Sequence, residues 1–379
     1  MKKPHPLFLN IFASLAIVAI VFILVIFRAS RPKIDKTTIE ATQRSVADWM
    51  LEHRRETSGG RGSDNTWTIG AWYVGMFSLY EQTKDPRYLE PLMEMENTVG
   101  WKLGKRPFFG DDQVIAQVYC DLYRTVKQDP SIIAHTIEVV DQQMTMPDPG
   151  LGAHTSALFE KGAWSWCDGL FMAPPMWARL ALVTGDRKYL DAMDEKYWKT
   201  YEFLYDKEEK LFYRDSSYFD QREQNGQKVF WSRGNGWVLG GLARLLEVMP
   251  ADYPTRNKYQ ALFVEMAERI KGLQQTDGLW RPSLLDPESY PTGETSGTAF
   301  FTYALAWGVN NNLLRAEDYK PTLTKGWLAL INSIQPDGRL GWAQPIGQDP
   351  KLVKAEDTEV YAVGAFLLAG REILNMKMR

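Results

Sequence analysis

The stretch TTIEATQRSVADWMLEHRR (residues 37–55), followed by TIGAWYVGMFSLY (residues 68–80), carries the pattern that decides the fold. In the first segment Ile39, Thr42, Val46 and Met50 recur at three- and four-residue spacing, which is typical of an amphipathic helix facing water on one side. The second segment is apolar nearly all round, and a helix of that kind is buried. Together they predict an outer helix followed by an inner helix.

This outer–inner pair repeats along the chain. The amphipathic segments are residues 37–55, 86–99, 131–146, 188–205, 254–274 and 319–334, and the apolar ones are 68–80, 112–126, 169–184, 236–248, 297–310 and 359–374. Six outer and six inner helices in strict alternation predict an all-α fold, the (α/α)6 barrel. A helical solenoid would have the same period, but the long connectors before the inner helices favour a barrel with its functional residues at one rim.

The connectors add two smaller predictions. QTDGLW (residues 275–280) and QPDGRLGW (residues 335–342) each follow an outer helix, and Asp-Gly suits a tight turn, so we expect small hairpins there. Strand is expected only sparsely, for instance at residues 211–213.

The N-terminus has a different character. Lys2 and Lys3 precede residues 7–27, an apolar run interrupted only by Asn10 and Ser14. This is about the 20 residues that a membrane-spanning helix needs, and it is longer than the core of a cleavable signal peptide. We therefore predict that residues 1–36 form a cytosolic tip, a transmembrane or signal-anchor segment and a linker, and that residues 37–379 form an exported (periplasmic or extracellular), membrane-tethered barrel. Secretion through an atypical signal peptide is the second interpretation.

Composition excludes several classes of protein. The net charge is -3 with no basic cluster, so no nucleic-acid partner is expected. Cys120 and Cys167 are too few for a disulfide scaffold, and we expect two ordinary buried thiols. The four histidines lack the spacing of a metal site, and no metal or other cofactor is predicted; an all-carboxylate calcium site is the alternative. The sequence makes no prediction of oligomeric state.

In such a barrel all inner helices run in one direction, so their N-termini emerge at the same end. Residues from most of the chain are thereby expected around one pocket, where helix N-termini favour an anionic ligand. The residues expected at these N-termini are Trp67, Asp111, Asp112, Trp166, Asp168, Arg233, Asn235, Trp237, Thr295, Ser296, Glu356 and Asp357.

Asp168 is the leading candidate for proton transfer. Trp164 and Trp166 precede it, and their indole rings would exclude water and raise the pKa of the carboxyl, as a general acid requires. In the pair Asp111 and Asp112, one carboxylate is expected to cap a helix and the other to point into the barrel, where like charges would keep a proton in the site. The alternative for all three is helix capping, which gives a carboxylate of low pKa.

Arg233 lies before a Gly-Asn-Gly segment that predicts a turn into an inner helix. A guanidinium suits bidentate binding of a carboxylate, and glycines let the backbone approach a ligand closely. Trp231 and Trp237 flank this segment, and indole rings stack on the apolar faces of sugars. The alternatives are an arginine that bridges barrel loops and tryptophans that pack between helices.

Several motifs together resemble one enzyme family. FWSRGNGW (residues 230–237), WCDGLFMAPP (residues 166–175) and ETSGT (residues 294–298) are similar to the unsaturated glycuronyl hydrolases of glycoside hydrolase family 105, with family 88 as a more distant relative. YAVGAFLLAG (residues 361–370) also fits. The resemblance extends over essentially the whole chain after residue 37.

The resemblance implies an enzyme that removes a 4,5-unsaturated uronic acid from the non-reducing end of oligosaccharides left by polysaccharide lyases. In that reaction an Asp protonates C4, water adds at C5, and the hemiketal collapses to release the aglycone. The catalytic Asp corresponds to Asp168 and the second active-site Asp to Asp112. The uronate subsite corresponds to Trp166, Trp231, Arg233 and Trp237, and we add Asn235 and Arg214 as substrate-binding candidates. No metal or organic cofactor is implied.

Arg214 marks a departure from the family, because many relatives carry a histidine after the short Phe-Tyr strand that precedes the Arg-Gly-Asn-Gly motif. Arg214 could bind a carboxylate or sulfate, or form a salt bridge with Asp215. Two other interpretations of the site stay open: an inverting glycosidase with Asp168 as acid and Asp112 as base, and a catalytically inactive membrane-tethered sugar-binding protein. Aglycone recognition is expected on the rim loops 150–162, 218–229 and 284–293.

Overall fold

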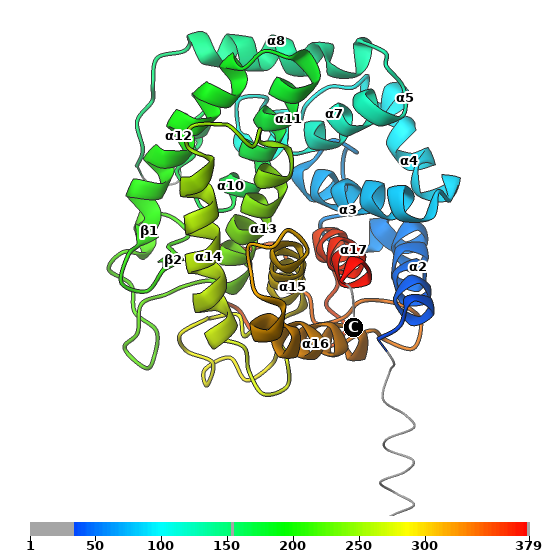
Figure 1. Ribbon diagram of the computed structural model, residues 1–379, viewed down its shortest axis with the longest axis vertical. Helices are drawn as coiled ribbons and strands as arrows, with labels where there is room; N and C mark the ends of the chain where they lie inside the picture. Colours follow the sequence, from blue (N-terminus) through cyan, green and yellow to red (C-terminus); the bar gives the residue numbers. More distant parts are fainter. Residues whose placement is uncertain (1–33, 153–154, 377–379) are drawn as a thin grey trace, which may run out of the picture.

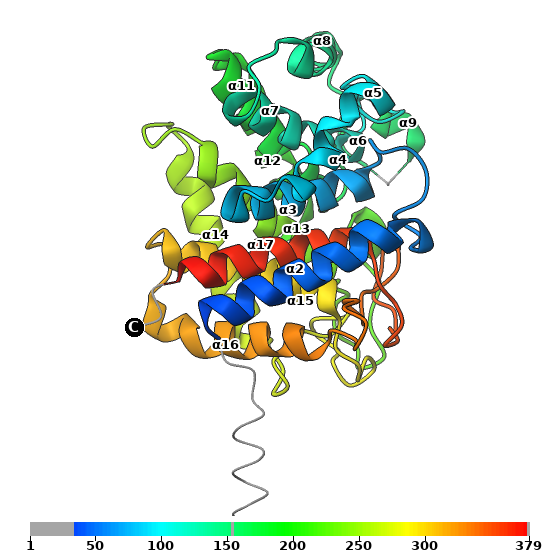
Figure 2. The same cartoon turned by 90° about the vertical axis from the view of Figure 1, so that its right-hand side faces the viewer.

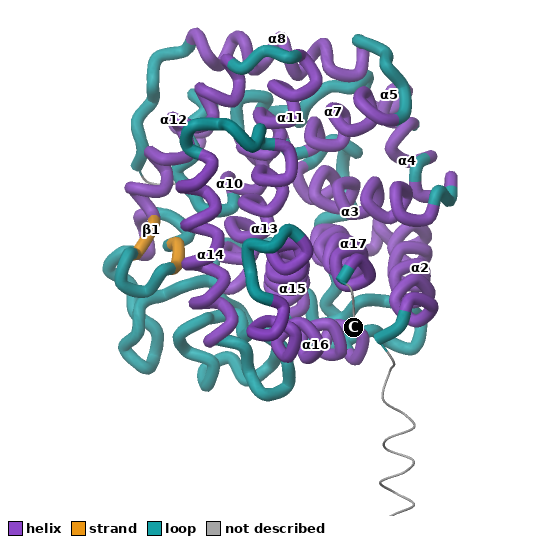
Figure 3. Tube along the Cα trace, viewed as in Figure 1, coloured by secondary structure: helices purple, strands orange, loops and turns teal. Residues whose placement is uncertain are grey.

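The computed structural model describes residues 34–152 and 155–376, most of which lie in helices (Figures 1 and 3). The elements are α2 (Lys36–His53), η1 (Arg54–Glu56), α3 (Trp67–Thr83), η2 (Pro86–Tyr88), α4 (Glu90–Met93), α5 (Met95–Val99), α6 (Gly110–Gln113), α7 (Ile115–Thr125), α8 (Ser131–Thr145), α9 (Ser156–Phe159), α10 (Gly169–Met172), α11 (Pro174–Thr184), α12 (Lys188–Leu204), β1 (Tyr205–Asp206), β2 (Leu211–Phe212), η3 (Ser216–Tyr218), α13 (Ser232–Val248), α14 (Arg256–Gly272), α15 (Thr295–Asn310), α16 (Ala316–Asn332) and α17 (Val360–Asn375).

The longer helices form two concentric layers. The inner helices α3, α7, α11, α13, α15 and α17 contact one another in that order, with α10 against α13, and α17 closes the ring against α3. The outer helices α2, α8, α12, α14 and α16 pack on α17, α7, α11, α13 and α15, and η2 packs on α3. The alternation expected from the sequence is therefore confirmed, and the ring of helices is that of an (α/α)6 barrel.

The loops that carry the candidate residues gather at one end of this barrel. Figure 2 shows α3 and α17 lengthwise, with long connecting loops near the end where α17 begins and the C-terminus at the opposite end. This is the rim arrangement expected from the common direction of the inner helices.

Two inner helices are interrupted. The expected helix 169–184 divides at Ala173 into α10 and α11, because Pro174 and Pro175 have no N–H to donate to the preceding turn. The expected helix 112–126 begins earlier, at Gly110, and divides at Val114 into α6 and α7. The outer segment 86–99 is likewise broken, into η2, α4 and α5, and Pro91 lies in the first turn of α4.

The start of α13 corrects one expectation. Arg233, Gly234 and Asn235 were expected in a turn before the helix, but α13 begins at Ser232 and includes them. The glycines serve close packing: a Cβ on Gly234 would lie 3.0 Å from the Sγ of Cys167, and one on Gly236 would lie 3.0 Å from the Cβ of Phe300.

The smaller predictions are confirmed. The Asp-Gly connectors form tight hairpins, in which the N–H of Gln275 donates to the carbonyl of Leu279 and the N–H of Gln335 to that of Arg339. The short strand β2 pairs antiparallel with β1. Cys120 and Cys167 are buried and free.

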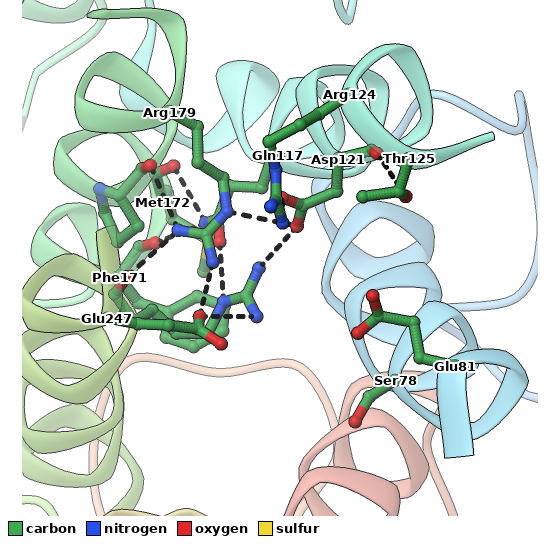
Figure 4. Close-up of polar contacts among 12 residues, drawn as sticks. Ser78, Glu81, Gln117, Asp121, Arg124, Thr125, Phe171, Met172, Arg179 and Glu247 are labelled. Carbon is green, nitrogen blue, oxygen red and sulfur yellow. Dashed lines mark hydrogen bonds and ion pairs between the residues drawn. The ribbon is translucent and has the colours of Figure 1, made fainter. Parts of the chain in front are cut away.

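A buried charge network joins three inner helices toward their C-terminal ends (Figure 4). The carboxylate of Asp121 on α7 accepts hydrogen bonds from Arg179 on α11 (3.1 Å) and Arg244 on α13 (3.3 Å). Glu247 also accepts from Arg179, at 2.6 Å. Although burial opposes ionisation, the two guanidinium groups hold the pKa of Asp121 below its usual value. The network therefore fixes the relative positions of α7, α11 and α13 away from the candidate site.

The expected membrane segment, residues 7–27, lies outside the described residues. Within residues 34–152 and 155–376 no helix is both long enough and apolar enough to cross a membrane.

Candidate active site

A cavity of 420 Å³ lies at the end of the barrel where the inner helices begin. Its wall combines three carboxyl groups, several cationic side chains and a set of aromatic rings. It is lined by Trp67, Arg106, Phe109, Asp111, Trp166, Asp168, Met172, Arg214, Trp231, Arg233, Trp237, Ile346, Gly347, Gln348, Asp349 and Lys351. The structure thus brings together Asp168, Trp166, Arg214, Trp231, Arg233 and Trp237, as expected.

Asp168 directly precedes α10, yet its carboxylate makes no hydrogen bond to the helix N-terminus. The capping alternative is therefore wrong for this residue. Its Oδ1 is buried without a hydrogen-bond partner among the described residues, and its Oδ2 lies 3.4 Å from the Nε of Arg214. Burial raises the pKa of Asp168, against the opposing effect of Arg214 and Arg233. A buried carboxyl of raised pKa can hold a proton and deliver it to a bound ligand.

Asp111, not Asp112, shares the cavity with Asp168. The indole N–H of Trp166 donates to Oδ1 of Asp111 at 3.1 Å, which fixes the carboxyl beside the site. Burial, together with the nearby charges of Asp168 and Asp112, raises the pKa of Asp111 to about 8. The carboxyls of Asp111 and Asp168 therefore oppose each other's ionisation, as expected for like charges in one site.

Asp112 is turned away from this cavity, which corrects the expected pairing with Asp168. Its carboxylate accepts the backbone N–H of Arg106 at 2.8 Å, and its two oxygens accept the Nε and Nη2 of the same arginine at 3.1 and 2.8 Å. A Cβ on Gly104 would lie 2.6 Å from the Asp112 carboxyl, so a glycine is needed for this close packing. Asp112 thus holds the turn at residues 104–106 and orients Arg106.

Arg214 is buried and pairs with two carboxylates. Its Nη1 lies 2.5 Å from Oδ2 of Asp215, which is the expected salt bridge, and its Nε faces Asp168. The carbonyl of Arg214 accepts the N–H of Cys167 at 2.8 Å. This backbone hydrogen bond joins the segment that follows β2 to the residue before Asp168. Arg214 is therefore placed to stabilise Asp168 as an anion once its proton has left.

Arg233 lines the cavity, but most of its polar contacts are internal. Its Nη1 and Nη2 donate to the carbonyls of Gln344 (2.6 Å) and Pro345 (3.0 Å), and the guanidinium lies 4.4 Å from the ring centre of Trp231. The Nε is buried and has no acceptor among the described residues. Arg233 therefore bridges a barrel loop, as one alternative held, while its side chain also borders the cavity.

The tryptophans divide between ligand-facing and structural contacts. Trp166 stacks on Phe109 with ring centres 4.7 Å apart. The indole N–H of Trp231 donates to Oε1 of Gln344 at 3.1 Å. Trp237 packs against Phe300, with ring centres 4.2 Å apart, while one side borders the cavity. All three rings are fixed before any ligand binds.

Asn235 is not in the cavity, contrary to its expected contact with substrate. Its Oδ1 accepts the N–H of Phe212 at 2.8 Å, and its Nδ2 donates to the carbonyls of Phe212 and Trp231. Because its side chain is fully buried and its hydrogen bonds are used internally, Asn235 ties β2 to the start of α13. It thereby sets the position of Arg214, two residues beyond Phe212.

Several lining residues were missed. Arg106, Phe109 and Met172 were not singled out, although Phe109 and Met172 flank residues that were. The segment 346–351 lies in a connector without helical or strand signal and differs from the expected rim loops 150–162, 218–229 and 284–293. Thr295, Ser296, Glu356 and Asp357 do not line the cavity.

A larger hollow of 820 Å³ lies elsewhere, along the outer helix α12. A hydrogen bond from Lys199 lowers the pKa of Asp148 there, so this acid is held in its charged form. Because the raised pKa values of Asp111 and Asp168 suit proton transfer, we place the chemistry in the smaller cavity. Among the described residues no group of three or more His, Cys, Asp or Glu is arranged to hold a metal ion.

Comparison with known proteins identifies close relatives. A family model described as Glycosyl Hydrolase Family 88 matches residues 39–377. The chain is 40% identical over 352 residues to the Unsaturated 3S-rhamnoglycuronyl hydrolase of Formosa agariphila, which covers 91% of this chain and 92% of that protein.

Two solved structures share the fold over nearly their whole length. One is a glycosyl hydrolase family 88 protein from Bacteroides vulgatus, with a TM-score of 0.79 and 31% identity over 90% of this chain and 99% of that one. The other is named as a polysaccharide lyase, with a TM-score of 0.80 and 34% identity over 89% of this chain and 97% of that one.

Proposed function

The chain belongs to Glycosyl Hydrolase Family 88 and hydrolyses oligosaccharides that carry an unsaturated uronic acid, and from this premise we propose that Asp168 is its general acid and base. The observation that carries the proposal is the pair Asp168 and Asp111 in one cavity, both with a raised pKa. One proton kept on such a pair is available for transfer to carbon at neutral pH.

The proposed reaction is hydration of an enol ether. Asp168 gives its proton to C4 of the unsaturated sugar, and the positive charge that develops at C5 and the ring oxygen faces the carboxylates. Water then adds at C5, and its second proton returns to Asp168. The resulting hemiketal opens to a ketone at C5, and the hemiacetal left at C1 releases the aglycone.

The surrounding residues would stabilise the ionised form of Asp168 and hold the sugar next to it. Arg214 stabilises the carboxylate after proton transfer, and Trp166 holds Asp111 in place beside it. Arg233, whose side chain lines the cavity, would bind the uronate carboxylate. The ring faces of Trp231 and Trp237 shape the subsite for a sugar.

The test is the ultraviolet absorbance of the conjugated double bond. With an unsaturated uronyl disaccharide the purified enzyme should abolish the absorbance, and one molecule of aglycone should appear for each double bond consumed. The saturated disaccharide should remain intact. Cleavage of the saturated sugar would instead support the inverting glycosidase, and binding without turnover would support the inactive sugar-binding protein.

Lyase chemistry is the second candidate, because one similar structure is named as a polysaccharide lyase. A lyase removes a proton from C5 and therefore needs a base, whereas the raised pKa values of Asp111 and Asp168 favour the acid form. The same assay separates the two, since a lyase acting on an intact polysaccharide increases the absorbance.

For the aglycone we propose rhamnose linked to the unsaturated uronate. The proposal rests on the 40% identity to a relative named Unsaturated 3S-rhamnoglycuronyl hydrolase. A higher kcat/KM with an unsaturated uronyl–rhamnose disaccharide than with an unsaturated uronyl–glucose disaccharide would support it, and the reverse order would contradict it.

We also propose that residues 7–27 tether the barrel to a membrane, with the barrel exported. The support is the apolar length of this run. The full chain should sediment with membranes and be released by detergent but not by high salt, whereas a chain starting at residue 34 should remain in the supernatant. Recovery of both forms in the supernatant would contradict the tether.

A further inference from the structure

The break between α10 and α11 takes the usual helical donors away from two backbone carbonyls. Pro175 has no N–H to donate to the carbonyl of Phe171, four residues earlier. The N–H of Met176 donates to the carbonyl of Ala173, at 2.9 Å, instead of to that of Met172. Phe171 and Met172 are both buried, so their carbonyls need donors from another part of the chain.

Gln117 on the inner helix α7 supplies a donor to both carbonyls (Figure 4). Its Nε2 lies 2.8 Å from the carbonyl oxygen of Phe171 and 3.3 Å from that of Met172. A side-chain amide nitrogen carries two N–H groups, one for each carbonyl. Because Gln117 is fully buried, no water would replace it, and its loss would leave both carbonyls unsatisfied.

Arg244 on α13 determines which end of the Gln117 amide faces α10. The Nε of Arg244 donates to Oε1 of Gln117 at 3.1 Å, and this contact directs the amide nitrogen to the two carbonyls. Asp121 accepts from a different nitrogen of the same arginine, Nη2. The orientation of Gln117 therefore depends on Arg244 and does not require Asp121.

The helix that Gln117 holds carries cavity residues at both of its ends. Asp168 directly precedes α10, and Met172, its last residue, lines the cavity. The ring of Phe171 packs on that of Trp237, which also borders the cavity, with ring centres 4.8 Å apart. Since α10 has only four residues, a shift at the end that contacts Gln117 also displaces Asp168.

We propose that Gln117 is a positioning residue that holds α10 where the carboxyl of Asp168 can deliver its proton to the unsaturated sugar. It acts through the carbonyls of Phe171 and Met172 and not through contact with the sugar. This inference rests on the role proposed above for Asp168. A displacement of about 1 Å between an acid and the atom that it protonates can cost up to about 10²-fold in rate.

Binding of the sugar does not depend on the same contact. Trp231 and Arg233 lie at the start of α13, where the side chain of Gln344 accepts from Trp231 and its carbonyl accepts from Arg233. These contacts do not involve α10. Loss of the Gln117 amide should therefore lower kcat and leave KM nearly unchanged.

The test uses two variants that remove the N–H donor in different ways. Gln117→Met has a side chain of similar length without polar hydrogens, whereas Gln117→Glu keeps an acceptor for Arg244 but has no N–H for the carbonyls. With an unsaturated uronyl disaccharide, both should lower kcat about tenfold and change KM less than about twofold. The kcat would be expressed per folded protein, below the melting transition of each variant.

Gln43→Met is the matched control. Gln43 is also fully buried and also joins helices, since its Nε2 donates to the carbonyl of Leu367 at 3.0 Å and its Oε1 accepts from Gln82 at 2.9 Å. This control should lower the melting temperature but keep the wild-type kcat.

A wild-type kcat in either Gln117 variant, an effect confined to KM, or an equal loss of kcat in Gln43→Met would overturn the positioning role. Near-normal turnover of Asp168→Asn in the same assay would instead overturn the role proposed for Asp168.

Discussion

Burial in the same cavity raises the pKa of both Asp111 and Asp168 and so opposes the ionisation of each carboxyl. Residues selected for stability alone would not be buried together as two acids, since each opposes the charge of the other. Their placement therefore costs stability at neutral pH, a common feature of catalytic sites.

This cost gives a prediction for Asp111→Asn. The folded pKa of Asp111 is about 8, above its unfolded value, so wild-type stability is full below the unfolded pKa and falls as pH rises towards 8. Asn removes this loss and can still accept the N–H of Trp166. The melting temperature at pH 8 should rise by roughly 2–4 °C relative to wild type, with a smaller rise at pH 5. An equal or lower Tm of the variant at pH 8 would contradict the claim that ionisation of the buried Asp111 carboxyl lowers the stability of the wild type.

Arg214→Gln tests the partner of Asp168. Removing the guanidinium removes a charge that lowers the pKa of Asp168, so that pKa should rise. The acid would then keep its proton to higher pH, and the alkaline limb of kcat/KM should move up by about 1 pH unit, with a lower kcat. Arg222→Gln, at an exposed position, is the control. An alkaline limb that is unchanged or shifted to lower pH would contradict the effect of Arg214 on the pKa of Asp168.

At the scale of elements, the start of α13 shows what a sequence pattern can and cannot fix. The Arg-Gly-Asn-Gly segment was correctly associated with an inner helix, but glycines permit both a turn and close helix packing. Only the neighbours, Cys167 and Phe300, decide for packing. Asn235 follows the same logic: its type suited a ligand contact, but its partners, Phe212 and Trp231, come from tertiary structure.

The charge network of α7, α11 and α13 predicts that one substitution lowers the stability of the protein and leaves its catalytic rate nearly unchanged. Asp121→Asn leaves Arg179 and Arg244 buried without their shared carboxylate, which should cost about 3 kcal/mol of unfolding free energy. Chemical denaturation measures this loss. The kcat at a temperature where the variant is folded should stay close to wild type, because the network lies away from the cavity.

Glu202→Gln, which breaks an exposed pair with Lys207, should leave the stability unchanged. A small effect of Asp121→Asn, similar to that of Glu202→Gln, would mean that the buried network does not hold the three helices together.

At the scale of the whole molecule, the alternation of outer and inner helices, together with the long connectors before the inner helices, predicted the barrel and the rim that carries the site. Most of the candidate residues followed, because inner-helix N-termini meet at one end. The choice between Asp111 and Asp112 did not follow, since successive helical residues point about 100° apart and the sequence does not fix that rotation. The segment 346–351 was missed because a connector without periodicity gives no sign of where it folds.

The central claim is that Asp168 transfers the proton and that Asp112 does not. Consumption of the double bond by Asp168→Asn and by Asp112→Asn, measured side by side on folded protein, tests it most directly. Asp168→Asn should lower kcat by about 10³-fold with the melting temperature unchanged or higher, and Asp112→Asn should lose far less. Turnover of Asp168→Asn within tenfold of wild type, or an equal loss in both variants, would contradict it.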